Sequence, residues 1–171
     1  MKKLWTFIIS AFLVWAVVIT TACPGKEKAE QTYRKGRELS AQMSIYGEKL
    51  IRANIDAFKA GEISQSQLAE LNKATGAFVE AVRVYRAALD EAKRQIEAGV
   101  DSATATGMLS ALFNERVVDA FFLIMEKLKL FPGANSETVK SIISGIRLTI
   151  LAVQGAFSDA RHLQKEVESW A

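Results

Sequence analysis

Apolar residues recur every three or four positions through most of this chain, and this spacing constrains the fold more than any other feature. Between positions 68 and 96 the spacings alternate between three and four over four heptads, which is typical of a long helix packed against other helices. No stretch alternates apolar and polar residues for long enough to predict a strand. The pattern therefore predicts an all-α fold. The face in question consists of Leu68, Leu71, Thr75, Phe78, Val82, Tyr85, Leu89, Ala92 and Ile96.

Residues that begin and end helices divide the chain into four long helices. We predict helices over about 26–60, 64–98, 101–131 and 135–171. The second begins with the capping box of Ser64 and Gln67, and Gly61 and Gly99 end the first and second. Because the connections are short, consecutive helices should be antiparallel neighbours in an up-down-up-down four-helix bundle. A pair of long hairpins that dimerise is the alternative.

The other three helices have similar apolar faces. Their residues are Leu39, Met43, Tyr46, Leu50, Ala53 and Ala57 in the first, Phe113, Val117, Phe121, Ile124, Leu128 and Phe131 in the third, and Val139, Ile143, Ile146, Ile150, Val153, Phe157, Ala160, Gln164 and Val167 in the fourth. We interpret the apolar stretch 142–157 as part of a core helix and not as a membrane span, because Arg147 lies near its middle.

The third helix has a second apolar stripe that the first face does not explain. Val118, Phe122 and Met125 form this stripe, and Leu123 and Leu130 widen it. A helix that is apolar nearly all round is usually buried on more than one side. One interpretation is that the helix is enclosed within its own monomer, covered by a smaller stripe of Ile51, Ile55 and Phe58. The other is a surface for self-association or for an envelope protein partner.

The first 23 residues have the organisation of a secretory signal. Lys2 and Lys3 precede an uncharged apolar run from 4 to 18, and small residues lead to Cys23, the only cysteine in the chain. This end of the segment resembles the lipobox of bacterial lipoproteins, with Thr20 in place of the usual leucine three residues before the cysteine. The resemblance implies that residues 1–22 are removed and that the sulfur of Cys23 carries a diacylglyceryl group, which would attach the protein to a membrane.

Two other outcomes for this segment stay open. Signal peptidase acting after Ala22 would release a soluble protein, and an uncleaved segment would span the membrane as a helix. All three outcomes export the rest of the chain, so we expect a bacterial cell-envelope location that faces the periplasm or the cell exterior. Residues 23–25 then form a minimal tether, and residues 26–171 form one helical domain.

Composition disfavours several classes of function. The chain has 22 basic and 19 acidic side chains, two of the basic ones in the signal, so the remainder is almost neutral and nucleic-acid binding is not expected. His162 is the only histidine, which is too few for a di-iron carboxylate site. No glycine-rich phosphate loop occurs, and we expect no metal, no cofactor and no catalytic residues.

These observations predict a lipid-anchored, non-enzymatic protein that acts as an interaction or structural module at the membrane surface. The alternative is a carrier or sensor of an apolar ligand held between the helices, because small residues such as Ala53, Thr75 and Ala92 on the apolar faces would leave room for one. The membrane would be one partner, through Cys23. A second copy or another envelope protein would be the other, through the third helix.

Overall fold

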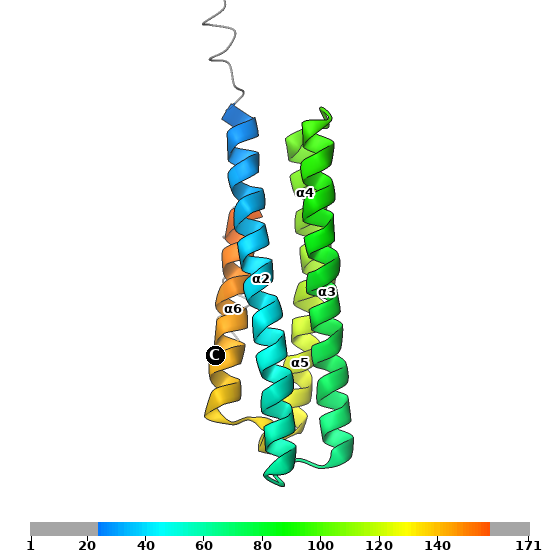
Figure 1. Cartoon of the computed structure of the whole chain (residues 1–171), viewed down its shortest axis with the longest axis vertical. Helices are drawn as coiled ribbons and strands as arrows, with labels where there is room; N and C mark the ends of the chain where they lie inside the picture. The colour runs from blue at the N-terminus through cyan, green and yellow to red at the C-terminus, as the bar shows by residue number, and fades with distance from the viewer. Residues whose placement is uncertain (1–23, 158–171) are drawn as a thin grey trace, which may run out of the picture.

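The computed structural model describes residues 24–157, which form helices and contain no strand. The protein is all-helical in this range, and Figure 1 shows its four long helices side by side as a bundle. The third of them is made of three consecutive segments. The elements are α2 (Pro24–Lys59), α3 (Gln65–Glu97), the α4 (Ser102–Leu112), η1 (Phe113–Val118) and α5 (Asp119–Leu130) segments of the third helix, the short 3₁₀ turn η2 (Pro132–Ala134) and α6 (Glu137–Phe157).

The helix ends follow from the capping residues in the sequence. The capping box is confirmed: the Gln67 N–H donates to the Ser64 hydroxyl, and the Ser64 N–H donates to the Gln67 side chain at 2.8 Å. Asp101 caps α4 by accepting a hydrogen bond from the Thr104 N–H at 2.9 Å. Gly61 and Gly99 follow α2 and α3 with φ of +75° and +97°, a conformation that side-chain-bearing residues rarely adopt.

The predicted apolar faces form the core. On α3, Phe78, Val82 and Tyr85 have no exposed surface, and the side chains of the other helices close around them. The rings of Tyr85 and Phe113 lie 4.9 Å apart and tilted, an arrangement that aromatic pairs favour. Burial of each large apolar side chain contributes about 1.5–3 kcal/mol, so these faces supply most of the stability of the bundle.

Polar contacts between helices add specificity to this apolar packing. Asn54 of α2 is buried, and its amide donates to the Asn72 side chain of α3 at 3.2 Å. A buried polar pair of this kind penalises helix registers that would separate the two amides. Lys127 of α5 also donates to Glu70 of α3 at 2.7 Å, on the more exposed side of the interface. The pairing of α3 with both of its neighbours is therefore fixed by polar contacts as well as by shape.

Three glycines allow close contacts between elements. A Cβ at Gly145 of α6 would lie 2.6 Å from Cζ of Tyr46 in α2. A Cβ at Gly47 would lie 2.5 Å from Cγ2 of Val79, so α2 and α3 approach closely there. A Cβ at Gly133 would overlap the backbone oxygen of Glu62, because η2 packs against the turn between α2 and α3. The turns at 60–64 and 131–136 consequently lie together at one end of the bundle (Figure 1).

The third and fourth helices differ from the prediction in some details. The third helix was expected to be one regular α-helix, and it is interrupted by the π-helical segment η1. Ile143, predicted on the core face of the fourth helix, is half-buried and packs against the core, and its neighbour Ile142, which was not assigned to that face, is more deeply buried. The part of that helix beyond Phe157 lies outside the described residues.

Candidate functional site: a groove between α5 and α6

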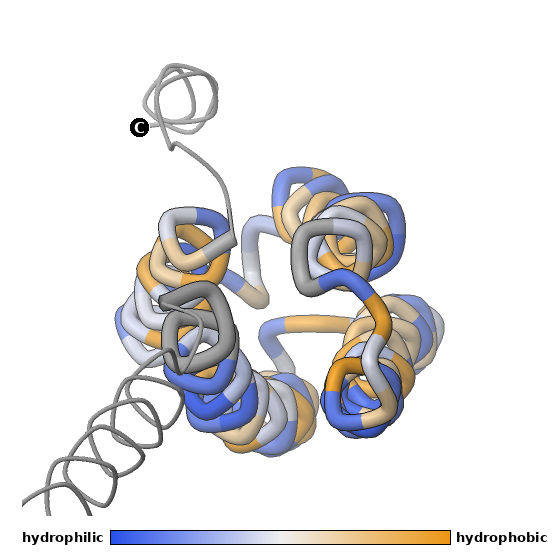
Figure 2. The backbone as a smooth tube through the Cα atoms, turned by 90° about the horizontal axis from the view of Figure 1, so that it is seen from above, coloured by the Kyte–Doolittle hydropathy of each residue, from blue (hydrophilic) through white to orange (hydrophobic). Residues whose placement is uncertain are grey.

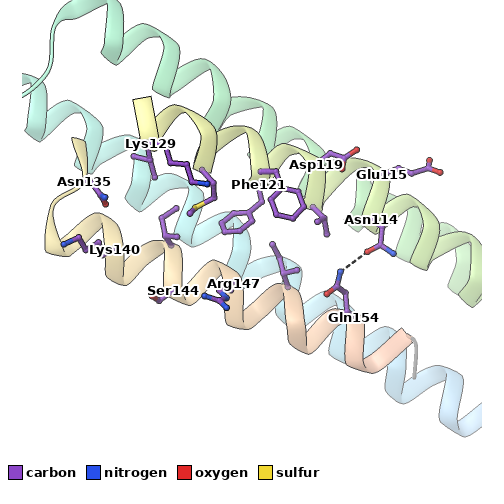
Figure 3. Close-up of a pocket in the computed structure, with 16 residues that line it drawn as sticks. Asn114, Glu115, Asp119, Phe121, Lys129, Asn135, Lys140, Ser144, Arg147 and Gln154 are labelled. Atoms are coloured by element: carbon purple, nitrogen blue, oxygen red, sulfur yellow. Dashed lines mark hydrogen bonds between the residues drawn. The ribbon is translucent and has the colours of Figure 1, made fainter. Parts of the chain in front are cut away.

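The helices do not pack equally around the bundle, and a groove results. α2 packs against α3 and α6, and α3 packs against α4, η1 and α5, whereas α6 contacts α4 and has little direct contact with α5. Figure 2 shows the helices from above, arranged around a common centre. The space between α5 and α6 is a groove of about 810 Å³, with η1 at one end (Figure 3).

The floor of the groove is apolar. It contains the second stripe predicted for the third helix, namely Val118, Phe122 and Met125, all half-buried. Core side chains from both helices complete it; these are Phe121, Leu128, Ile143 and Ile150. None of Ile51, Ile55 and Phe58 lines the groove, so the expectation that this stripe of the first helix covers the second stripe is wrong. An apolar floor that no helix covers is the feature expected of a binding surface.

The π-helical segment forms the end of the groove that lies farther from the α5–α6 turn. Five buried residues from Ala105 to Phe121 are spaced exactly four apart, namely Ala105, Leu109, Phe113, Val117 and Phe121. An α-helix turns about 100° per residue, so this run would drift by about 160° around a regular helix. The wider turns of η1 absorb part of that drift and keep all five residues in the core. Single π-helical turns occur frequently at functional sites.

A hydrogen bond joins the two walls at this end. The buried Gln154 of α6 donates from Nε2 to Oδ1 of Asn114 in η1, at 3.0 Å (Figure 3). The π-helical segment therefore presents Asn114 to α6, and the bond ties α6 to the third helix where the groove begins. At the other end of the groove lie Asn135 and Lys140, next to the turn that connects α5 to α6.

Charged side chains on the rim are separated by sign. The acidic residues Glu115 and Asp119 line the half near η1. The basic residues Lys129 and Lys140 line the half near the α5–α6 turn, Arg147 lies near the middle, and Lys140 pairs with Glu137 at 2.7 Å. An apolar floor with a polarised rim suits an amphipathic occupant that carries charges of both signs.

The remaining residues of the predicted surface lie beside the groove. Leu123 and Leu130 have 39% and 59% of their surface exposed, and neither lines the groove. Leu123 instead lines a shallow hollow on the outer side of α5, together with Phe122. The wall formed by α6 was not predicted, because Ile143 and Ile150 were assigned to the core face. The adjacent pair Ile142 and Ile143 was the available signal, since neighbouring residues point about 100° apart and two isoleucines there indicate an apolar face wider than one core-facing line.

Some of the residues singled out in the sequence lie outside the described range. Cys23, His162 and Trp170 are among them. Within residues 24–157 no group of three or more His, Cys, Asp or Glu side chains is placed to hold a metal ion. In that same range α6 is long and apolar enough to cross a membrane over Glu137–Ala156. α6 packs against α2 and contains Arg147 near its middle, and 39% of this stretch is buried within the bundle.

Comparison with known proteins found no matching family model, no similar curated protein and no similar solved structure.

Proposed function

We propose that this protein is a lipid-anchored, non-enzymatic module of the bacterial cell envelope, in which the α5–α6 groove binds the apolar face of an amphipathic helix. The fold we propose for it is an up-down-up-down four-helix bundle that follows a removed signal peptide. The lipid would be attached to Cys23, immediately before Pro24 at the start of α2, so the bundle would stand directly on the membrane surface. A location facing the periplasm or the cell exterior follows from export.

The apolar floor of the groove is the observation that carries this proposal. Phe122 and Met125 are held on a rigid helix, they are only half-buried, and the charges lie on the rim. The groove follows α6 from Lys140 to Gln154, about 21 Å at 1.5 Å per residue, which is the length of four helical turns. Recognition of a helix in an apolar groove uses this combination of length, floor and rim.

The lining also supports a role in binding over one in catalysis. Its 16 residues include one hydroxyl side chain, Ser144, and no histidine or cysteine. Ser144 is exposed, and among the described residues no acidic side chain of the lining forms a hydrogen bond with it. A serine nucleophile needs an adjacent base to be activated.

Site-specific photo-crosslinking in intact cells tests the proposal. A photoreactive residue at Phe122 should give crosslinked peptides with apolar residues at helical spacing, three and four apart. The matched control is Leu148 on the outer face of α6, which is 67% exposed and does not line the groove. Equal crosslinking from both positions, or none from Phe122, would contradict the proposal.

The second candidate is a carrier of an apolar ligand, and the size of the groove favours it. A volume of about 810 Å³ falls within the range of small-molecule sites. Native mass spectrometry separates the two candidates. A small apolar mass that co-purifies with the protein and disappears in a Met125→Glu variant supports the carrier, whereas a protein complex disrupted by the same substitution supports the helix-binding module.

A further inference from the structure

We propose that the α5–α6 groove binds the α5 helix of a second copy of this chain, in a two-fold pair whose bundles run in opposite directions. This inference rests on the proposed function, because it names the amphipathic helix that the groove binds. Three observations carry it: the apolar residues exposed beside the groove, the order of charges along α5, and the level at which basic residues lie on the two walls.

The outer face of α5 is an apolar surface that borders the groove. Leu123 and Leu130 are 39% and 59% exposed, and they are seven residues apart, so both project from the same side of the helix. Phe122 connects this face to the groove, because it lines both the groove and the shallow hollow on the outer side of α5. Large apolar side chains exposed next to an apolar groove indicate a surface for protein association.

The charges on α5 are ordered so that the helix complements a reversed copy of itself. Asp119 and Lys129 are both exposed, and both lie where the groove and the outer hollow meet. They are ten residues apart, about 15 Å along the helix. With a two-fold axis near position 124, Asp119 of each copy lies opposite Lys129 of the other, which is the self-complementarity that a two-fold interface requires. A parallel pair would instead place Asp119 opposite Asp119.

The α6 wall adds a second basic residue at the same level. The hydrogen bond between Asn114 and Gln154 fixes a common level on the two walls. Lys129 follows Asn114 by fifteen residues and Lys140 precedes Gln154 by fourteen, so both lysines lie about 21 Å along the groove from that bond. Figure 3 shows the two on opposite walls. Asp119 of the reversed copy would therefore lie between two lysines, which favours this orientation.

The reversed orientation has a consequence for the proposed lipid anchor. In such a pair the two α2 helices begin at opposite ends, so copies that stand on a membrane can form it only if their membranes face each other. The pair would then link two membrane surfaces. Purified full-length protein in detergent is free of this constraint, so the association can be measured there independently of the anchor.

Complementary charge reversals in the full-length protein test the pairing. Asp119→Lys and Lys129→Glu should each raise the dissociation constant of the pair about tenfold, because both symmetric ion pairs become like-charge contacts. A one-to-one mixture of the two variants should associate as tightly as the native protein, since each mixed pair regains an attractive contact at both places. Sedimentation velocity with one variant fluorescently labelled measures the mixed pair.

Glu126→Gln is the matched control. Glu126 is also exposed and lines the same outer hollow, but near the two-fold axis it lies close to Glu126 of the other copy. Its neutralisation removes a like-charge contact and should not weaken the pair. Circular dichroism of each variant establishes that the bundle is folded. Weaker association of Glu126→Gln would contradict the position of the axis.

Each other outcome overturns the inference. Native protein that stays monomeric in detergent, or single charge reversals that associate as tightly as the native protein, would exclude this pair. A mixture that does not recover would mean that the two charges act within each copy and not across the interface. The proposed function fails separately: crosslinks from Phe122 to a different protein would contradict this inference alone, whereas the absence of any crosslink from Phe122 would contradict the proposed function itself.

Discussion

At the scale of single residues, the helix contacts in this bundle depend on which glycines have a neighbouring helix within contact distance of the Cβ position. Gly47 and Gly76 both lie in the interior of a helix, and a sequence pattern does not distinguish them. In the structure a Cβ at Gly47 would collide with Val79 of the neighbouring helix, whereas Gly76 faces open space. The two positions should therefore respond in opposite ways to the same substitution.

We expect Gly76→Ala to raise the free energy of unfolding by about 0.5–1 kcal/mol, because alanine favours the helix and restricts the unfolded chain. Gly47→Ala should lower it by about 1–2 kcal/mol, since the added methyl group overpacks the α2–α3 contact by more than the helix gains. Urea unfolding followed by circular dichroism measures both. If the two substitutions change stability in the same direction, the helices can separate at Gly47 at little cost.

Buried tyrosines should make the bundle sensitive to alkaline pH. Burial raises the pKa of Tyr85, and the nearby Tyr33 phenol adds to the effect; burial also raises the pKa of Tyr33. Above about pH 10 the unfolded chain releases these protons while the folded protein retains them. The stability contribution is therefore complete below that pH and is lost as pH rises, by up to about 1.4 kcal/mol per pH unit for each group.

Tyr85→Phe should make this loss smaller. We expect the free energy of unfolding of the variant to fall less steeply between about pH 9 and 11 than that of the native protein. Urea unfolding at a series of pH values gives both slopes, and the comparison removes the contribution of other titrating groups. Parallel slopes would show that Tyr85 ionises equally in the folded and unfolded protein.

At the scale of elements, the third helix is the unusual one, because η1 interrupts it. A π-helical turn is equivalent to one extra residue inside an α-helix. Here the extra residue reconciles the four-residue spacing from Ala105 to Phe121 with a continuous core face, and it presents Asn114 to Gln154 across the groove. The segment therefore links the packing of the helix to the shape of the candidate site.

Deletion of Arg116, an exposed residue of η1, should be tolerated. The shorter chain can form a regular α-helix that keeps both Leu109 and Phe121 in the core. We therefore expect the free energy of unfolding to fall by no more than about 1–2 kcal/mol. Deletion of Arg83, an equally exposed arginine in the regular helix α3, should unfold the protein, because every later residue of α3 rotates by about 100° out of register.

Thermal unfolding of the two deletion variants, followed by circular dichroism, gives the comparison. Loss of the cooperative transition in both would mean that η1 is required for the fold and is not an extra residue that packing accommodates. The Arg116 deletion also removes the geometry that brings Asn114 to Gln154, so groove-dependent crosslinking from Phe122 should decrease in a variant that still folds.

At the scale of the whole molecule, the proposed attachment to the membrane would decide which end of the bundle faces outward. α2 begins at Pro24, directly after the proposed lipid site, and the α2–α3 and α5–α6 turns lie together at the opposite end (Figure 1). A lipid on Cys23 would place the basic half of the groove, near the α5–α6 turn, away from the membrane. That half would then be accessible to a partner in the envelope.

Intact mass spectrometry of protein extracted from membranes tests this attachment. We expect a chain that begins at Cys23 and carries added acyl mass, and we expect a Cys23→Ala variant to lack that mass. A mass that still includes residues 1–22 would indicate an uncleaved helical anchor. An unmodified chain beginning at Cys23 would indicate a soluble protein, and the orientation described above would have no basis.

The sequence by itself determined the helices and most of the core. The apolar period and the caps are local properties, because an α-helix places every third or fourth residue on one face whatever surrounds it. That is why Ser64 capped α3 as predicted and why Phe78 and Val82 are fully buried. The second stripe of Val118, Phe122 and Met125 was also apparent in the sequence for this reason.

Only the tertiary structure decided what lies opposite that stripe. The distance between two helices depends on the packing of all the others. Here α6 packs on α2 and α4, and it leaves the apolar stripe of α5 that faces the groove uncovered. The same dependence separated the crowded Gly47 from the uncrowded Gly76, and it left Ile143 partly open to the groove while Ile142 is buried. The helix face on which a residue lies depends only on its own helix. The residues that it contacts depend on how all the helices pack together.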